Sequence, residues 1–250
     1  VQSGDLTADQ LFDLLSGLRR ERHRLVVGEI VSALWAASEM LVDETTRPGF
    51  EAFVAATLGP LAREMGWEKR AKDTDDDERL RRTVLGALGA LTSDPWMQKE
   101  ATKRADAFAK DPKSVRREIA PLALSIAARS GDASRWDGIV AFIEKVKTPE
   151  DRSLAVATLG AFGNPELLRK SLDLVRSGRL RMQDLSTLAG EVSQWRASRP
   201  VFYAWVKEHM AELKTKLPSF FVARFADLPD EMCTAAERAD AETFLTGALA

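Results

Sequence analysis

The sequence predicts an all-α fold, an α-solenoid or superhelix built from HEAT-like antiparallel helix pairs. Apolar residues recur at three- and four-residue spacing along nearly the whole chain, which is the period of an amphipathic helix. No stretch shows sustained period-two alternation between hairpin turns, so strands are not expected. A capping side chain stands directly before a proline, a pattern that marks helix starts, at Asp94-Pro95, Asp111-Pro112, Thr148-Pro149 and Asn164-Pro165.

The N-terminal elements follow from these signals in chain order. Periodicity predicts helices at 6–18, 24–43, 49–65 and 77–92. We expect Asp76 or Asp77 to cap the fourth of these, since acidic charge is favourable at a helix N-terminus. The next two helices start at the first two proline pairs and are predicted at 95–109 and 113–130.

The C-terminal elements are delimited by the remaining proline pairs and by glycines. Glycine in the left-handed conformation commonly closes a helix, and we expect this at Gly131, Gly163 and Gly178. The remaining helices are predicted at 133–146, 149–162, 165–177, 181–194, 199–216, 218–227 and 231–248.

The chain is predicted to form one helical domain, residues 1–250. From residue 77 the helix pairs recur about every 32 to 37 residues, the range of helical-repeat arrays, without a tetratricopeptide or ankyrin consensus. The polar stretch 69–77, "KRAKDTDDD", is predicted to be an exposed loop. It separates an N-terminal helical group, 1–68, from a HEAT-like array, 78–250.

Composition excludes several classes of partner. The 36 basic residues nearly balance the 38 acidic ones, so no global field attracts nucleic acid or an anionic membrane. No apolar run is long enough to span a bilayer. Cys233 is the only cysteine, which excludes an internal disulfide and favours a reducing compartment, so we expect a cytoplasmic location.

No catalytic or metal-binding residue is predicted within the chain. A hydrolytic zinc site usually needs H-E-x-x-H, and this chain has only His23 and His209, in unrelated contexts. The odd-spaced acidic run from Asp73 resembles the start of a calcium loop, but Glu78 replaces the required glycine and Val84 the required Glu. Phosphate-binding loops are absent as well.

The aromatic residues near 195–205 allow two interpretations. Aromatic side chains at helical spacing usually fill the core. With neighbouring arginines they could instead line a peptide groove, where both residue types are favoured contacts. The candidate groove residues are Trp195, Arg196, Arg199 and Tyr203.

Several segments, in order and spacing, resemble the helical C-terminal domain of aminopeptidase N-type zinc metallopeptidases, the gluzincin family. The resemblance runs from about residue 4 to 247. Where the family tends to read N-P-x-G-R-x-x-A-W, this chain has "WRASRPVFY", so contacts made there in relatives do not transfer directly. The segments are "LAREMGWE" (61–68), "GDASRWDGI" (131–139), "TPEDRSLAVATLGAFGNPELLRKSLDL" (148–174), "RMQD" (181–184) and "VKEHMAELKTKLP" (206–218).

The resemblance implies a non-catalytic domain that closes over an upstream catalytic domain and limits or shapes peptide access. The zinc ion and its ligands would belong to that upstream domain, so we expect these residues to be a fragment of a longer, bacterial zinc metalloaminopeptidase. Its expected partners are the catalytic domain and a peptide substrate. The alternative is a free-standing HEAT-like scaffold that binds a protein or peptide on its concave face.

Overall fold

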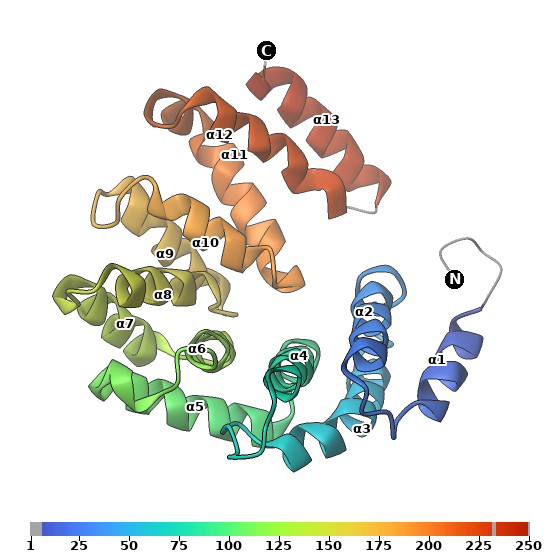
Figure 1. Cartoon of the computed structure of the whole chain (residues 1–250). Coiled ribbons are helices and arrows are strands. Elements are labelled where there is room, and N and C mark those ends of the chain that lie inside the picture. Colours follow the sequence, from blue (N-terminus) through green and yellow to red (C-terminus); the bar gives the residue numbers. More distant parts are fainter. Residues whose placement is uncertain (1–6, 232–233, 250) are drawn as a thin grey trace. The chain divides into compact units, whose positions relative to one another are not determined.

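The computed structural model describes residues 7–231 and 234–249, and all regular structure in these ranges is helical. The all-α prediction is therefore confirmed. The chain divides into two compact units, one ending at Ala127 and the other starting at Ala128. Figure 1 shows the order of the helices along the chain.

Unit 1 is organised around the helix α4. This helix packs against α2, α3 and α5, and its side chains Val84, Leu85 and Leu88 are completely buried. Leu34 of α2 and Val54 of α3 are buried in the same core. The elements are α1 (Ala8–Gly17), α2 (Arg24–Met40), α3 (Arg47–Met65), α4 (Asp75–Leu91), α5 (Pro95–Lys110), the 3₁₀ helix η1 (Pro112–Ser114) and α6 (Ala120–Arg129), which crosses the unit boundary.

Unit 2 repeats this pattern of neighbouring helices. The helix α8 packs against α7, α9 and α10, and α11 packs against α9 and α10. Leu159, Leu172, Leu185 and Trp205 are completely buried between them. The elements are α7 (Ala133–Lys145), α8 (Pro149–Gly160), α9 (Pro165–Arg176), α10 (Asp184–Val192), η2 (Arg196–Ser198), α11 (Arg199–Lys216), α12 (Ser219–Ala223), η3 (Arg224–Glu231) and α13 (Ala235–Leu249).

Two of the four predicted helix starts at proline pairs are capped by the expected side chain. The carboxylate of Asp94 accepts from the backbone N–H of Met97, and the Asn164 side chain accepts from two N–H groups of α9. Thr148 precedes α8 but makes no capping bond, because its hydroxyl bonds the Asp151 carboxylate instead. The prediction for α4 was wrong, since Thr74 is its cap and Asp77 completes a capping box.

The helix predicted at 113–130 begins later than expected. Asp111 caps only the short helix η1, after which Val115 is extended. The helix α6 starts at Ala120 and places Pro121 in its first turn, where a missing N–H costs nothing. This segment therefore holds two prolines at helix starts: Pro112 begins η1, and Pro121 lies in the first turn of α6.

Among the predicted glycine stops, Gly178 has a positive φ of 80° and is confirmed, whereas Gly131 and Gly163 are not left-handed. A β-carbon at Gly163 would lie 2.5 Å from the carbonyl oxygen of Arg129, so glycine is required there for close packing. The left-handed residue that sequence reasoning missed is Gly66, with φ of 63°, which ends α3.

The polar stretch 69–77 is mostly exposed, but its last three residues belong to α4. Arginines from three elements hold it and the preceding residues in place. Arg81 is buried and pairs with both Asp73 and Glu78, and Arg116 pairs with Glu78 at 2.6 Å. Arg104 stacks over the Trp67 ring at 4.7 Å. The loop is thus fixed within unit 1, and the unit boundary lies further along the chain, in α6.

Candidate functional site

The four predicted groove residues lie where α10 ends and α11 begins, in unit 2. A 3₁₀ turn, η2, connects these helices, and Ser198 within it is buried. Two of the four side chains face the protein interior and two face solvent. The structure therefore places them close along the chain without presenting all four on one surface.

Trp195 is packed into unit 2, with 8% of its surface exposed. Its indole N–H donates to the Glu191 carboxylate at 3.1 Å. The guanidinium of Arg129, from the end of α6, lies over its ring at 4.7 Å, a cation–π contact. Trp195 therefore links α6 to the end of α10, as the core-packing interpretation expects.

The two arginines differ in exposure. Arg196 is exposed, while Arg199 is half-buried. Arg199 Nε donates to the backbone carbonyl of Ser193 at 3.0 Å. Because the last carbonyls of a helix lack partners within it, this bond caps the end of α10.

Tyr203 is buried between α11 and α13. Its hydroxyl donates to Asp240 Oδ2 at 3.0 Å, and its ring meets the edge of Phe244 at a centroid distance of 5.6 Å. The Lys207 ammonium binds the same carboxylate at 2.6 Å and lies 5.2 Å from the tyrosine ring centre. Burial and the Asp240 carboxylate raise the pKa of Tyr203 to about 12, so its hydroxyl remains a donor at neutral pH.

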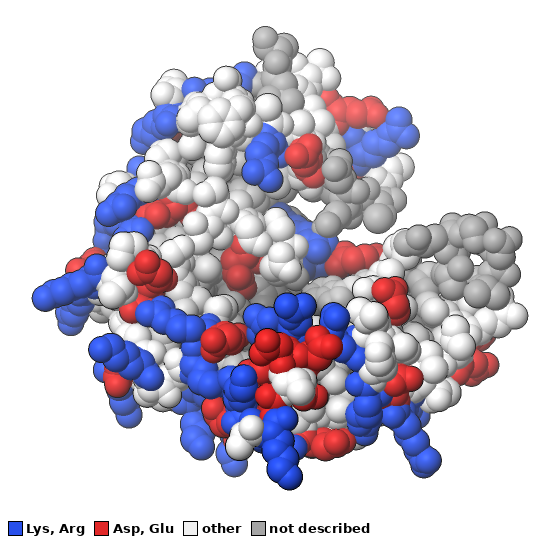
Figure 2. All heavy atoms as spheres, viewed as in Figure 1, with Lys and Arg blue, Asp and Glu red and all other residues white. Residues whose placement is uncertain are grey.

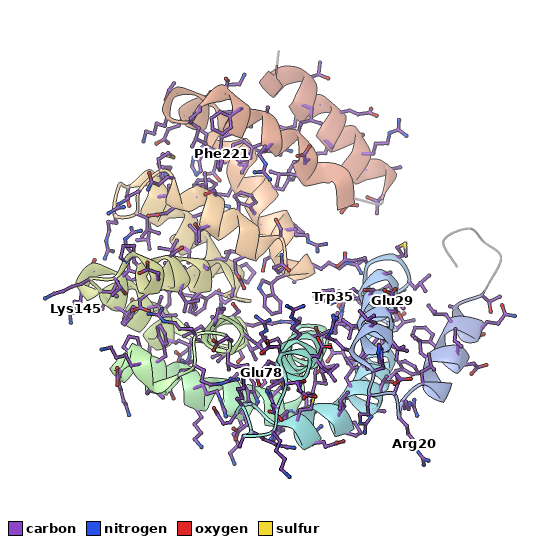
Figure 3. The ribbon with its side chains drawn as sticks, in the orientation of Figure 1. Arg20, Glu29, Trp35, Glu78, Lys145 and Phe221 are labelled. Atoms are coloured by element: carbon purple, nitrogen blue, oxygen red, sulfur yellow. The ribbon has the colours of Figure 1, made fainter. Side chains whose placement is uncertain are left out.

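The neighbouring aromatic residues form the centre of unit 2. The indole N–H of Trp205 donates to Asp173 at 3.0 Å, and Phe202 stacks on the Trp205 ring. Phe202 also contacts Phe225, which in turn contacts Phe221 (labelled in Figure 3). Phe202, Trp205 and Phe225 are buried, as the core interpretation expects, whereas Phe221 is half-buried.

The described side chains of the site offer cationic and hydrogen-bonding contacts. The described residues contain no group of three or more histidine, cysteine, aspartate or glutamate side chains that could hold a metal ion. His23 and His209 belong to different units, and Cys233 lies outside the described residues. The described residues of this chain therefore do not fit a zinc site.

Sequence reasoning missed Asp240 and Lys207, which determine the surroundings of Tyr203. No local signal identifies Asp240, because it lies 37 residues from Tyr203 in the chain, whereas Lys207 lies one helical turn from Tyr203 on α11, a spacing that the sequence does show. On the face shown in Figure 2, acidic and basic side chains are mixed, and neither sign forms a large continuous patch. Within the described ranges, no helix is both long and apolar enough to cross a bilayer.

Comparisons with known proteins agree along almost the whole chain. The family model described as ERAP1-like C-terminal domain matches residues 1–249. The chain is 25% identical over 226 residues to Aminopeptidase 2 of Candida albicans, covering 87% of this chain and 24% of that protein. It is 22% identical over 219 residues to the mitochondrial Aminopeptidase 2 of Saccharomyces cerevisiae, covering 86% and 23%. It is 24% identical over 224 residues to Aminopeptidase M1 of Arabidopsis thaliana, covering 86% and 25%. The chain thus spans about a quarter of the length of these relatives.

Proposed function

This chain belongs to the family of ERAP1-like C-terminal domains, which are C-terminal domains of aminopeptidase N-type enzymes, and from this we propose that it serves a zinc aminopeptidase as a non-catalytic domain. In this proposal it closes over the catalytic domain and limits or shapes the access of peptides. The observation that carries the proposal is the family match over residues 1–249, together with relatives that are named aminopeptidases and are about four times as long.

The arrangement of helices within each unit supports a role in enclosing the space that peptides enter. Each of α4 and α8 packs against the helices before and after it, and α2–α4 and α8–α10 also pack as next-but-one neighbours. Stacked helix pairs of this kind form HEAT-like solenoids, whose extended surfaces suit them to enclose or bind a chain. We therefore include the HEAT-like solenoid in the proposal.

The chemistry of the proposed enzyme belongs to residues outside this chain. A zinc ion held there would polarise the scissile carbonyl and activate water. The residues described above contribute hydrogen bonds, cations and packed surface. A cytoplasmic location and a bacterial source also belong to the proposal.

The catalytic part of the proposal is tested by comparing two proteins, this 250-residue chain and the natural full-length protein. We expect the full-length protein to hydrolyse aminoacyl anilides and to lose this activity with a zinc chelator. The isolated chain with added zinc should show no turnover. Chelator-sensitive turnover by the isolated chain, or none by the full-length protein, would contradict the proposal.

The access role is best tested at Arg196, because its side chain is exposed whereas Trp195 is part of the core. In the full-length protein, Arg196→Ala should change the rate on peptides of about ten residues and leave the rate on a single-residue anilide within experimental error. Arg238→Ala, at another exposed arginine of unit 2, is the control and should change neither rate. Equal effects on long and short substrates would argue against a role in peptide access.

A further inference from the structure

The helix α13 is attached to unit 2 by few contacts. Among its side chains from Ala235 to Gly247, Ala241 alone is buried, and Phe244 and Leu245 are partly covered. Its main packing contacts are with α11 and η3. A helix of this length is marginal in water without a packed apolar face. Its position therefore depends strongly on the polar contacts it makes.

Two polar contacts between α13 and α11 share a single carboxylate. Asp240 accepts the hydroxyl hydrogen of Tyr203 at 3.0 Å and binds the Lys207 ammonium at 2.6 Å. The Asp240 side chain is 49% exposed and that of Lys207 is 32% exposed, so water and salt reach the ion pair. Exposed ion pairs are weak and are screened by salt. The weak contacts of this carboxylate, beside the ring contact between Tyr203 and Phe244, thus join the middle of α13 to α11.

The helix α11 does not depend on α13 in the same way. Trp205 bonds Asp173 of α9, and Phe202 packs on Phe225 of η3. Phe202 and Trp205 are 2% and 0% exposed, so they form a core within the rest of unit 2. Loss of α13 would leave these contacts in place. Tyr203 differs, since both its hydrogen bond and its aromatic contact go to α13.

We propose that α13 is a removable cover over Tyr203, held to α11 by Asp240. Tyr203 and Lys207 are spaced four residues apart and lie on one face of α11, and both contact α13. When α13 detaches, this aromatic–cation stripe is uncovered. The segment of α13 that covers it carries an acidic residue followed four residues later by an aromatic one, Asp240 and Phe244. The stripe therefore fits an acidic peptide segment with an aromatic residue one helical turn further on, and α13 occupies it as an internal ligand.

Detachment is tested by hydrogen exchange, read separately for α13 and α11, in this chain. Asp240→Asn removes the ion pair with Lys207 and keeps the shape of the side chain. We expect it to raise exchange in α13 about three- to fivefold, the size of an exposed ion pair, and to leave α11 unchanged. The control is Arg238→Met, which breaks an exposed pair with Glu242 within α13 and does not touch α11.

The proposal is upheld if α13 exchanges at least threefold faster in Asp240→Asn than in the control while α11 stays unchanged. It is overturned if the difference is smaller, or if α11 and α13 lose protection together. Tyr203→Phe provides a second variant with an intact ion pair and should raise exchange in α13 in the same direction, by a smaller factor.

Occupancy of the uncovered stripe is tested with a labelled peptide of the α13 sequence, residues 235–249. We expect it to bind Asp240→Asn about three- to fivefold more tightly than the wild-type chain, since the stripe is covered more of the time in the latter. A Lys207→Met substitution in the Asp240→Asn background should abolish this gain. Equal binding to both chains would refute the internal-ligand part of the proposal, and this result does not depend on whether the full-length protein is a peptidase.

Discussion

The ion pair between Arg152 and Asp184 should be one of the main polar supports of unit 2, and substituting Arg152 by Met tests this. The guanidinium makes two bonds to the carboxylate, at 3.0 and 2.7 Å, and thereby joins α8 to the start of α10. The two side chains are only 19% and 10% exposed. Asp184 also accepts the backbone N–H of Arg181 at 2.9 Å, a bond that the substitution leaves intact.

The expected loss follows from leaving this carboxylate without its cation. Removing one partner of a buried pair typically costs about 3–5 kcal/mol. Since some water reaches the Arg152–Asp184 pair and the Arg181 bond remains, we expect Arg152→Met to lower the unfolding free energy of unit 2 by about 2–3 kcal/mol. Methionine retains much of the apolar stem of arginine, so little of the loss should come from packing.

The matched control is Arg179→Met, which breaks an exposed pair. Arg179 and Glu144 are 53% and 56% exposed, and both belong to unit 2, like the pair of Arg152 and Asp184. Its loss should cost less than about 1 kcal/mol. Hydrogen exchange of α8 and α10 amides in increasing urea reads the free energy of unit 2 separately from that of unit 1. If the two substitutions cost the same within about 0.5 kcal/mol, the burial argument is wrong.

The dependence of stability on acid pH is a second test of the pair of Arg152 and Asp184. Burial raises the pKa of Asp184, but the bonds from Arg152 and from the Arg181 backbone outweigh it, so the pKa lies below its usual value. The stabilisation is therefore complete above the unfolded pKa, about 3.9, and is lost as the pH falls through the folded pKa. The difference between wild type and Arg152→Met should shrink over that window.

Two further predictions concern packing and pH. Gly163→Ala should destabilise the chain by about 1–3 kcal/mol, because its β-carbon meets a backbone oxygen that cannot move aside. Gly190→Ala in α10, where the β-carbon has open space, should stabilise it by about 0.5–1 kcal/mol, and equal thermal shifts for both would contradict this reasoning. Burial and then the positive charge of Arg176 lower the pKa of His209, so the unfolded chain binds the proton more readily. Stability should accordingly fall as the pH drops below about 6.5, and His209→Gln should flatten this dependence in urea titrations at pH 5 and 7.5.

Local signals located the helices well wherever they involved neighbouring residues. The prediction of a helix at 199–216 matches α11, and Asn164 caps α9 as expected. One error arose where a residue served a distant part of the chain. Gly163 looked like a helix stop, but it is small because the end of α6, more than 30 residues earlier, passes against it. The sequence alone does not distinguish a glycine required by close packing, such as Gly163, from one required by a positive φ, such as Gly178.

The candidate site shows the same limit in chemical terms. Aromatic residues with nearby arginines occur both in cores and in binding grooves, so composition at 195–205 could not separate the two. What separates them is the partner of each side chain: Glu191 for the Trp195 indole, and Asp240, from α13, for the Tyr203 hydroxyl. Trp195 has its partner on the adjoining helix and is buried beside it. Tyr203 has its partner on α13. In the proposal above, Tyr203 therefore stays buried only while α13 is docked on α11.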